Sequence, residues 1–288
     1  MQWLIAGFAL GAAVPASGQQ AAPARDAVNV TVTKQRKMLV EGWVNGLKGT
    51  FLVDTGAGNS YLGERFADAL RVPREEGGYS YNVMGSMRFD VVDVGRMELG
   101  RNRIPMAHTL IHVSNLGWVN NGRVDGNSVN GIIGADILIH NQAVIDCGQG
   151  VIRFGSPGGR GAAAPRLGVN FISRRGDELA VVARVNGVAG TFIVDTGYNV
   201  SMVSPEFAMR LSAGGQSRLR VIGVKSMEFG TGAVSAGRDQ FIVSNRIGIA
   251  NQGYIELGER PYDGVLGMDF LLGHHAVIDC RMMQLRVD

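Results

Sequence analysis

The sequence predicts an all-β fold, rich in strands with a few short helices, that is built from two related lobes. Glycine is frequent, at 42 of 288 residues, and apolar residues fall in short runs between turn residues, a pattern typical of strands joined by tight turns. Asn-Gly dipeptides separate paired apolar runs at two places. The two halves of the chain also repeat each other, which is the signature of a duplicated structural unit.

The Asn-Gly dipeptides predict two equivalent hairpins. Residues 38–44 and 47–54 flank Asn45-Gly46, and residues 178–185 and 188–195 flank Asn186-Gly187. Asn-Gly favours the type I′ turn, whose positive φ angles match the twist of paired strands. We therefore expect each pair of runs to form an antiparallel hairpin.

A short strand and a helix are expected after each of these hairpins. Ser204-Pro205-Glu206 is a favourable helix start, with a capping serine, a proline in the first turn and an acidic residue near the positive end. Gly63-Glu64, before residues 65–70, is a weaker start. Each copy is expected to close with a further hairpin, residues 143–147 with 151–154 and residues 276–280 with 284–287.

Two blocks of sequence recur in the same order. Residues 44–56 and 185–197 share Val-Asn-Gly-x-x-Gly-Thr-Phe-x-Val-Asp-Thr-Gly, with Asp195 lying 141 residues after Asp54. Residues 131–138 and 264–271 share Gly-x-x-Gly-x-Asp-x-Leu at an offset of 133, and Ala-Val-Ile-Asp-Cys follows both. We infer an internal duplication in which the second copy is shorter by eight residues.

The repeats and the composition between them divide the chain. Residues 155–166 contain Gly, Pro and Ala without an apolar pattern and are interpreted as an exposed linker. The prediction is a signal peptide at 1–18, an N-terminal lobe at 27–154, the linker at 155–166 and a C-terminal lobe at 167–288.

The first residues predict export. Residues 3–14 are apolar and are followed by small residues, as in a signal peptide, and the run is shorter than the ~20 residues that span a bilayer. The alternative is an uncleaved membrane anchor. We expect a periplasmic or secreted protein with no stable membrane association after signal removal.

The charge excludes one class of partner. The formal net charge is +3 and no run of Lys or Arg occurs, whereas nucleic-acid binding needs clustered positive charge. We therefore expect no nucleic-acid partner.

Asp54 and Asp195 are the candidate catalytic residues. Each follows a strongly apolar run, Phe-Leu-Val or Phe-Ile-Val, so its carboxyl group should emerge beside buried walls. Burial penalises the charged form of a lone carboxyl group. Two such groups brought together can share one proton, so that one acts as the base and the other as the acid.

The motifs around both aspartates resemble those of the retroviral-type (retropepsin-like) aspartic peptidases. Asp54 to Ser60 reads Asp-Thr-Gly-Ala-x-x-Ser with Gly-Ile-Ile-Gly downstream, and Asp195 to Ser201 reads Asp-Thr-Gly-Tyr-x-x-Ser with Gly-Val-Leu-Gly downstream. The C-terminal Val-Ile-Asp hairpins resemble the bacterial members of that family. The resemblance implies two lobes related by a pseudo-two-fold axis, as in a pepsin-like bilobal acid protease, each lobe giving one aspartate.

The resemblance also implies roles for the neighbouring residues. Thr55 and Thr196 would hydrogen-bond across the axis, and Gly56 and Gly197 would let backbone N–H groups approach the carboxylates. The remaining implied residues are Gly134 and Gly267, packed against the aspartate loops, and Gly85 and Gly223, in the candidate tips of substrate-binding flaps, Val83-Met84-Gly85 and Val221-Ile222-Gly223.

Other candidate groups have structural interpretations. His108 and His112 lie on an expected strand, where residues four apart are about 13 Å distant, so no metal site is expected. We expect Asp136 and Asp269 to cap helices. Cys147 and Cys280 occupy equivalent positions in the repeat, and we expect both to be small buried residues without a disulfide.

The predicted function is that of an exported aspartic endopeptidase without a cofactor, which hydrolyses peptides or unfolded proteins. The chain is expected to be a monomer whose lobes form an intramolecular pseudo-dimer, because a short tether favours pairing within the chain. One alternative is a non-catalytic peptide-binding protein on the same fold, supported by the large Tyr198 after the second Asp-Thr-Gly. Another is a tandem protease whose copies pair between chains.

Overall fold

The computed structural model describes residues 26–82, 85–118, 123–155, 167–172, 178–212, 220–230, 232–234, 237, 239–248, 251, 255 and 261–288. The predicted signal peptide and all of the predicted linker except Gly155 lie outside these residues. In the part of the chain that is described, no helix is both long and apolar enough to cross a membrane.

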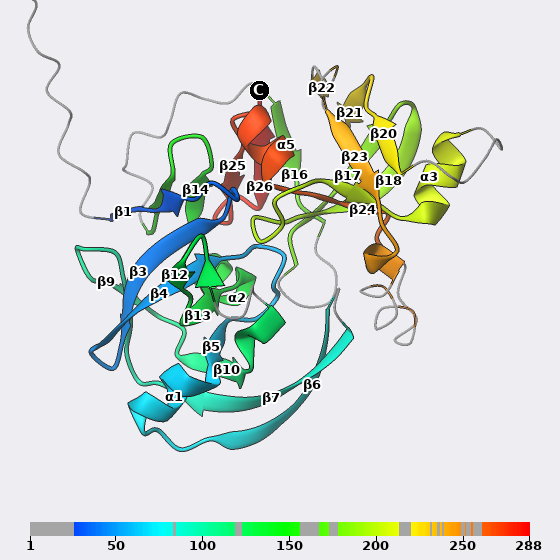
Figure 1. The fold of residues 1–288 in the computed structure, drawn as a ribbon. Helices are drawn as coiled ribbons and strands as arrows, with labels where there is room; N and C mark the ends of the chain where they lie inside the picture. The colour runs from blue at the N-terminus through cyan, green and yellow to red at the C-terminus, as the bar shows by residue number, and fades with distance from the viewer. Residues whose placement is uncertain are drawn as a thin grey trace, which may run out of the picture.

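The N-terminal lobe is a ten-stranded sheet with two short helices, drawn in blue to green in Figure 1. Its strand order is β6-β7-β10-β5-β13-β4-β3-β8-β9, with β2 paired to β3. A small separate pair, β11 (Arg123–Val124) and β12 (Asn127–Ser128), accompanies it. The elements are β2 (Thr31–Val32), β3 (Met38–Val44), β4 (Leu47–Val53), β5 (Tyr61–Gly63), α1 (Glu64–Leu70), β6 (Glu75–Asn82), β7 (Gly85–Asp93), β8 (Met97–Leu99), β9 (Ile104–Met106), β10 (Leu110–Ser114), the 3-10 helix η1 (Leu116–Trp118), β13 (Gly131–Ile133) and α2 (Ala135–His140).

The C-terminal lobe, mainly yellow to orange in Figure 1, is an eight-stranded sheet of corresponding order, β20-β23-β19-β24-β18-β17-β21-β22. In both lobes the strand that carries the aspartate pairs in parallel with the Gly-x-x-Gly strand, β4 with β13 and β18 with β24. The elements are β17 (Ala180–Val185), β18 (Val188–Val194), β19 (Met202–Val203), α3 (Pro205–Leu211), β20 (Val221–Gly223), β21 (Met227–Phe229), β22 (Gly232–Val234), β23 (Gln240–Val243), β24 (Gly264–Leu266) and α5 (Met268–Gly273).

A six-stranded sheet joins the two lobes. Its order is β1-β15-β14-β25-β26-β16, and the central pair is antiparallel, with Ile145 opposite Ile278. Because these two residues are equivalent in the repeat, the pseudo-two-fold axis passes between them. The strands are β1 (Ala27–Asn29), β14 (Val144–Asp146), β15 (Val151–Arg153), β16 (Leu167–Asn170), β25 (Val277–Asp279) and β26 (Gln284–Val287).

The predicted local structure is confirmed at the hairpins and at the second helix start. Asn45 and Gly46 have φ of 48° and 84°, and Asn186 and Gly187 have φ of 49° and 83°, as a type I′ turn requires. Ser204 caps α3 by accepting a hydrogen bond from the Phe207 N–H at 3.1 Å. Both terminal hairpins form as expected.

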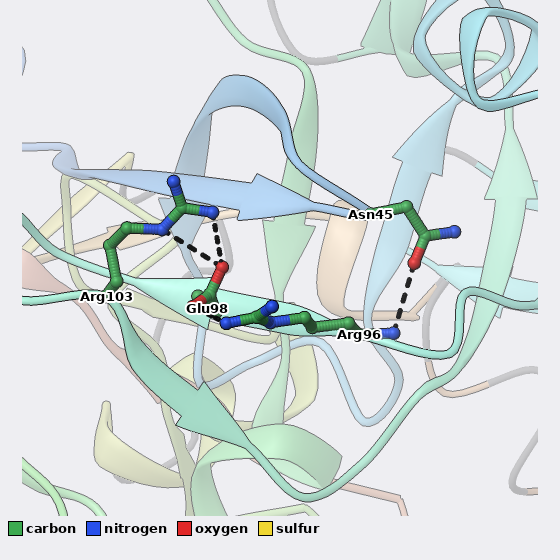
Figure 2. Close-up of polar contacts among 4 residues, drawn as sticks. All are labelled: Asn45, Arg96, Glu98 and Arg103. Atoms are coloured by element: carbon green, nitrogen blue, oxygen red, sulfur yellow. Dashed lines mark hydrogen bonds and ion pairs between the residues drawn. The ribbon is translucent and has the colours of Figure 1, made fainter.

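The buried carboxylate of Glu98 helps to hold the hairpin that carries Asp54 in the N-terminal lobe. Glu98 on β8 is only 3% exposed and accepts hydrogen bonds from Arg96 at 2.7 Å and from Arg103 at 2.5 and 3.1 Å. The Arg103 hydrogen bonds hold the pKa of Glu98 below its ordinary value. The Arg96 N–H also donates to the side chain of the turn residue Asn45 at 3.1 Å, which ties the hairpin to β8 (Figure 2).

The hydrophobic core runs through both lobes and the joining sheet. Alternate residues of β4 and β18, Phe51 with Val53 and Phe192 with Val194, are buried in this main core. The intervening Leu52 faces the opposite side of its sheet, where it belongs to a second cluster with Tyr61 and Ile132. Each strand is thus covered on both faces up to the residue before the aspartate.

Candidate active site

Asp54 and Asp195 lie directly after the last residues of β4 and β18. The N–H of Asp54 donates to the carbonyl of Ile133 on β13 at 3.0 Å, and the N–H of Asp195 donates to Leu266 on β24, also at 3.0 Å. The side chains are 8% and 7% exposed. The backbone of each aspartate therefore continues the strand pairing of its own lobe, which ends at the boundary between the lobes.

Thr55 and Thr196 connect the two aspartate loops, as the resemblance implied. The N–H of each threonine donates to the hydroxyl of the other at 3.1 Å. The hydroxyl of Thr55 donates to the carbonyl of Val194 at 2.7 Å, and that of Thr196 donates to Val53 at 2.8 Å. The two loops of one chain thus meet in a buried, symmetric set of four hydrogen bonds.

The glycines of both Asp-Thr-Gly sequences lie against the carboxyl groups. The Gly56 N–H donates to Asp54 Oδ1 at 3.0 Å, and the Gly197 N–H donates to Asp195 Oδ1 at 2.7 Å. A Cβ atom on Gly56 would overlap the carboxyl group of Asp195, and one on Gly197 would overlap that of Asp54. Glycine is required at both positions because each backbone is packed against the carboxyl group of the other lobe.

The two carboxyl groups hydrogen-bond to each other, and burial raises the pKa of both. The pKa of Asp195 lies well above its ordinary value because the negative charge of Asp54 adds to the effect of burial. Partly opposing this, Lys37 and the N–H groups of the glycines lower the pKa of both carboxyl groups. Two buried, adjacent carboxyl groups cannot both ionise readily, so the pair holds one proton over a range of pH.

Gly134 and Gly267 bring the later strand ends against the aspartate loops. A Cβ atom on Gly134 would lie 2.5 Å from the Asn59 carbonyl oxygen, and one on Gly267 would lie 2.6 Å from the Val200 carbonyl oxygen. Both distances are too short for a real carbon, so this packing requires glycine. The implied packing role of both residues agrees with the structure.

The expectation that Asp136 and Asp269 cap helices is confirmed only in part: each accepts a hydrogen bond from the N–H of the next residue in the first turn of its helix, Ile137 or Phe270, at 2.7 Å, but neither is the N-cap residue. The N-caps of α2 and α5 are Gly134 and Gly267, without a side-chain cap. Asp136 also accepts hydrogen bonds from the hydroxyl of Ser60 at 2.6 Å and from the Ser60 N–H at 2.9 Å. Asp269 accepts from the hydroxyl of Ser201 at 2.6 Å. The two carboxylates therefore brace the loops that follow the catalytic candidates.

The sequence contains a repeated signal for this pair of contacts. Serine recurs six residues after each aspartate, and an aspartate recurs two residues after each Gly134-type glycine. The Ser60 hydroxyl also accepts a hydrogen bond from the Gly134 N–H at 2.8 Å, and Ser201 does the same for Gly267 at 3.0 Å. The two recurring residues are therefore partners in one hydrogen-bond unit.

Gly85 and Gly223, the two glycines expected at flap tips, lie at different places in their lobes. Strands β6 and β7 form a long hairpin in which Gly85 begins β7 opposite Asn82, and the other tip candidates, Val83 and Met84, lie outside the described residues. Gly223 does not lie at a hairpin tip, contrary to the expectation. It is the last residue of β20, where it pairs with Gln240, and the chain then continues towards β21. Asp93 is the equivalent residue of the N-terminal lobe.

Apolar side chains line the sheet face beside Asp54. The second cluster contains Leu39, Leu52, Tyr61, Leu116, Val124, Val129 and Ile132, with Ala57 and the hairpin residues Met87 and Phe89 packed against it. In the other lobe a smaller cluster of Met202, Ile247 and Val265 is covered by Ile193, Tyr198 and Val200. Each aspartate loop thus has an apolar neighbourhood of its own.

Tyr198 does not displace either carboxyl group. Its N–H donates to Asp195 Oδ1 at 3.0 Å, while its partly buried ring packs on the apolar cluster of the C-terminal lobe. Burial raises the pKa of the Tyr198 hydroxyl. The backbone of Tyr198 therefore helps to hold the carboxyl group of Asp195 in place.

The other residues singled out in the sequence include His112 and the two cysteines. The ring of His112 stacks on Phe89 at a centroid distance of 3.9 Å, and among the described residues no three His, Cys, Asp or Glu side chains are grouped to hold a metal ion. Cys147 and Cys280 are buried and unpaired, as expected, and burial raises the pKa of each thiol to about 12.

Comparison with known sequences agrees with the motifs of the first lobe. Residues 40–137 match the sequence model of the aspartyl protease family. The N-terminal lobe carries the sequence pattern of an aspartyl protease. No curated protein matches the chain.

Comparison with solved structures identifies the fold. The crystal structure of aspartic proteinase from Irpex lacteus is similar, with a TM-score of 0.51 and 17% sequence identity, over 90% of this chain and 95% of that one. At this identity the likeness shows the fold alone. The fold class predicted from the sequence, a pepsin-like arrangement of two lobes, is confirmed.

Proposed function

We propose that this protein is an exported aspartic endopeptidase whose one active site uses Asp54 and Asp195 as its catalytic pair. One observation carries the proposal: two buried carboxyl groups, one from each lobe, hydrogen-bond to each other while Thr55 and Thr196 lock their loops together. The aspartyl protease match over residues 40–137 supports the same reaction class.

The reaction follows from the protonation of the pair. A water molecule held between the carboxyl groups loses a proton to the ionised aspartate as its oxygen attacks the carbonyl carbon of the peptide bond. The protonated aspartate donates its proton to the carbonyl oxygen, which stabilises the charge that develops there. The carbon–nitrogen bond then breaks as the amine nitrogen takes the proton that the first aspartate received from the water, one hydroxyl of the diol returns a proton to the second aspartate, and the carboxylic acid and amine products leave. These steps need no cofactor.

We propose an extended peptide segment or an unfolded protein as the substrate. The apolar cluster beside Asp54 includes Met87 and Phe89 from the long β6–β7 hairpin, so apolar side chains of a bound peptide would find matching surface on that side. Gly85, at the start of β7, is the candidate contact at the hairpin tip. Within this proposal the protein works as a monomer, because one chain supplies both aspartates.

Mapping cleavage products tests the reaction class. The purified protein is incubated with peptides blocked at both termini and with a reduced, unfolded protein, and the products are identified by mass spectrometry. Internal cleavage that is fastest at mildly acidic pH and unaffected by metal chelators is expected. Binding without cleavage from about pH 3 to about pH 8 would instead support the peptide-binding alternative.

Export has a separate test. The mature protein, recovered from outside the cytoplasm, is sequenced from its N-terminus. The proposal expects a start close after residue 18, whereas a protein that keeps residues 1–18 and remains with the membrane fraction would support the anchor alternative.

A further inference from the structure

A tight turn of the N-terminal lobe reaches the aspartate loop of the other lobe. Residues 33–37 connect β2 to β3. The Thr33 N–H donates to the carbonyl of Lys37 at 2.9 Å, and the Lys37 N–H donates to the hydroxyl of Thr33 at 3.0 Å. The backbone of Lys37 is therefore fixed at the end of a hydrogen-bonded turn.

Two consecutive cations of this turn contact the backbone that follows Asp195. The ammonium group of Lys37 donates a hydrogen bond to the carbonyl oxygen of Gly197 and lies 5.9 Å from the centroid of the Tyr198 ring. Arg36 donates to the carbonyl of Asn199 at 3.3 Å. Lys37 is partly buried, whereas Arg36 is exposed, so the charge of Lys37 is the less screened of the two.

The pseudo-symmetric position in the second copy carries the opposite charge. Glu178 follows Lys37 by 141 residues, the same interval as between the two aspartates. Glu178 lies beside Gly58, with its Cγ 3.9 Å from where a Cβ of that glycine would be, and it accepts a hydrogen bond from the Tyr262 hydroxyl at 2.5 Å. The duplicated site is therefore not electrostatically symmetric.

We propose that Lys37 is a positioning residue for the hydrolysis, whose fixed positive charge at the Gly197 carbonyl stabilises the ionised form of the aspartate pair. The inference rests on the proposed function, since it assigns Lys37 a part in that same site. Lys37 touches no reacting atom and acts through the protonation of Asp54 and Asp195.

The electrostatics of the two carboxyl groups agree with this role. The charge of Lys37 lowers the pKa of Asp54 and of Asp195, against the larger effect of burial. A nearby opposite charge favours the ionised form of a carboxyl group. Without Lys37 the pair would release each of its protons at a higher pH.

Other charged and titratable groups surround the pair and remain when Lys37 is replaced. Asp136 and Asp269 are engaged with the serines behind the loops, Asp125 accepts from the backbone of the turn, and Arg246 interacts with the Tyr198 hydroxyl. The full set to be kept constant is Arg36, Lys34, Tyr61, Asp125, Asp136, Glu178, Tyr198, Arg246 and Asp269.

The test compares Lys37→Met with Lys37→Arg and with Lys225→Met. The first removes the charge but keeps an unbranched side chain, the second keeps the charge, and the third removes a lysine charge from the turn between β20 and β21. The pH profile of kcat/KM is measured for each variant with a blocked peptide substrate, and the two aspartate carboxyl groups are titrated in the same proteins by carbon-13 NMR.

In Lys37→Met we expect both limbs of the pH profile, and both carboxyl titrations, to move to higher pH by about one pH unit. Lys37→Arg and Lys225→Met should keep the wild-type values. A Lys37→Met protein that is less stable or slower but has unmoved limbs and titrations would overturn the inference and leave Lys37 a structural contact.

The proposed function and the proposed role of Lys37 can each fail without the other. If the wild-type protein cleaves no peptide, the proposed function fails, yet the NMR titrations still decide whether Lys37 controls the carboxyl pair. If the wild-type protein cleaves and the titrations are the same with and without Lys37, only the inference about Lys37 fails. A thermal melt of each variant establishes that the proteins compared are folded.

Discussion

Thr55 and Thr196 are linked by two reciprocal hydrogen bonds, in which the N–H of each donates to the hydroxyl oxygen of the other at 3.1 Å. Each hydroxyl then donates to the carbonyl of the residue that precedes the aspartate of the opposite lobe. Both side chains are fully buried. The position of each aspartate is therefore set by the other lobe, which is what a site shared between two lobes requires.

Replacing Thr55 with valine should destabilise the protein by about 3 kcal/mol, because the buried carbonyl of Val194 and the N–H of Thr196 would both lose a partner. Denaturant unfolding measures the difference. Thr55→Ser retains the hydroxyl and is the matched control, with a smaller expected loss. A Thr55→Val protein as stable as the wild type, with a loss only in Thr55→Ser, would show that the methyl group, and not the hydrogen bonds, is what matters.

Asp54→Asn and Asp195→Asn should each lower kcat/KM by about 10³-fold to 10⁴-fold, because each removes one half of an acid–base pair. The double variant should be little worse than either single one, since groups that act as a unit are not additive. Initial rates with a blocked peptide check this. If either single variant kept about half of the activity, the two copies would be working in separate sites formed between chains.

The stability of the protein should fall as the pH rises through the range in which the aspartate pair ionises. The folded-state pKa of Asp195 lies well above the ordinary value of about 3.9. The folded state therefore binds more protons than the unfolded state from about pH 4 upwards, and this disfavours folding at higher pH.

Asp195→Asn removes this penalty. Because the raised pKa of Asp195 disfavours folding at neutral pH, the Tm of Asp195→Asn should exceed that of the wild type at pH 7. The two should approach each other at about pH 3, where both carboxyl groups of the wild type are protonated. Calorimetry at the two pH values measures the difference, and a gap that is the same at both would argue against a raised pKa.

The local parts of the fold could be predicted from the sequence because they depend on local chemistry. Asn45-Gly46 and Asn186-Gly187 adopt the positive φ angles that the dipeptide favours, and Ser204 begins α3 as a capping serine does. The pairing of Thr55 with Thr196 was also predicted, but from the family resemblance and not from any pattern in the chain.

Contacts between distant segments could not be predicted in the same way. Lys37 and Gly197 are 160 residues apart, and no periodicity in the sequence records that the turn of one lobe lies on the loop of the other. The position of Gly223 was wrongly expected because the copies differ most in that region, where only the N-terminal lobe has the described β6–β7 hairpin. An aspartate in the first turn of a helix is expected to accept an N–H of that turn, as Asp136 does, but nothing local indicates that it also holds Ser60, 76 residues away.

The hydrogen bonds of Ser60 with Asp136 and Gly134 should be as important to the stability of the protein as the hydrogen bonds of Thr55. The Ser60 hydroxyl donates to Asp136 at 2.6 Å and accepts from the Gly134 N–H at 2.8 Å, and all three groups lie where water is excluded. Ser60→Ala leaves the Gly134 donor and one Asp136 lone pair without this partner, so we expect a loss of about 2 kcal/mol.

The pseudo-symmetry of the chain supplies a matched comparison for this prediction. Ser201→Ala breaks the same pair of bonds in the other lobe and should cost a similar amount, whereas Ser86→Ala, at an exposed position of β7, should change the free energy of unfolding by less than about 0.5 kcal/mol. Denaturant unfolding of the three variants measures these differences.

Because the hydrogen bonds of Ser60 and Ser201 hold the backbone after each aspartate, Ser60→Ala and Ser201→Ala should also lower kcat while the limits of the pH profile stay unchanged. Full stability and activity in Ser60→Ala would mean that the Asp136 carboxylate finds another donor, and that the loop is held by the contacts of Thr55 alone.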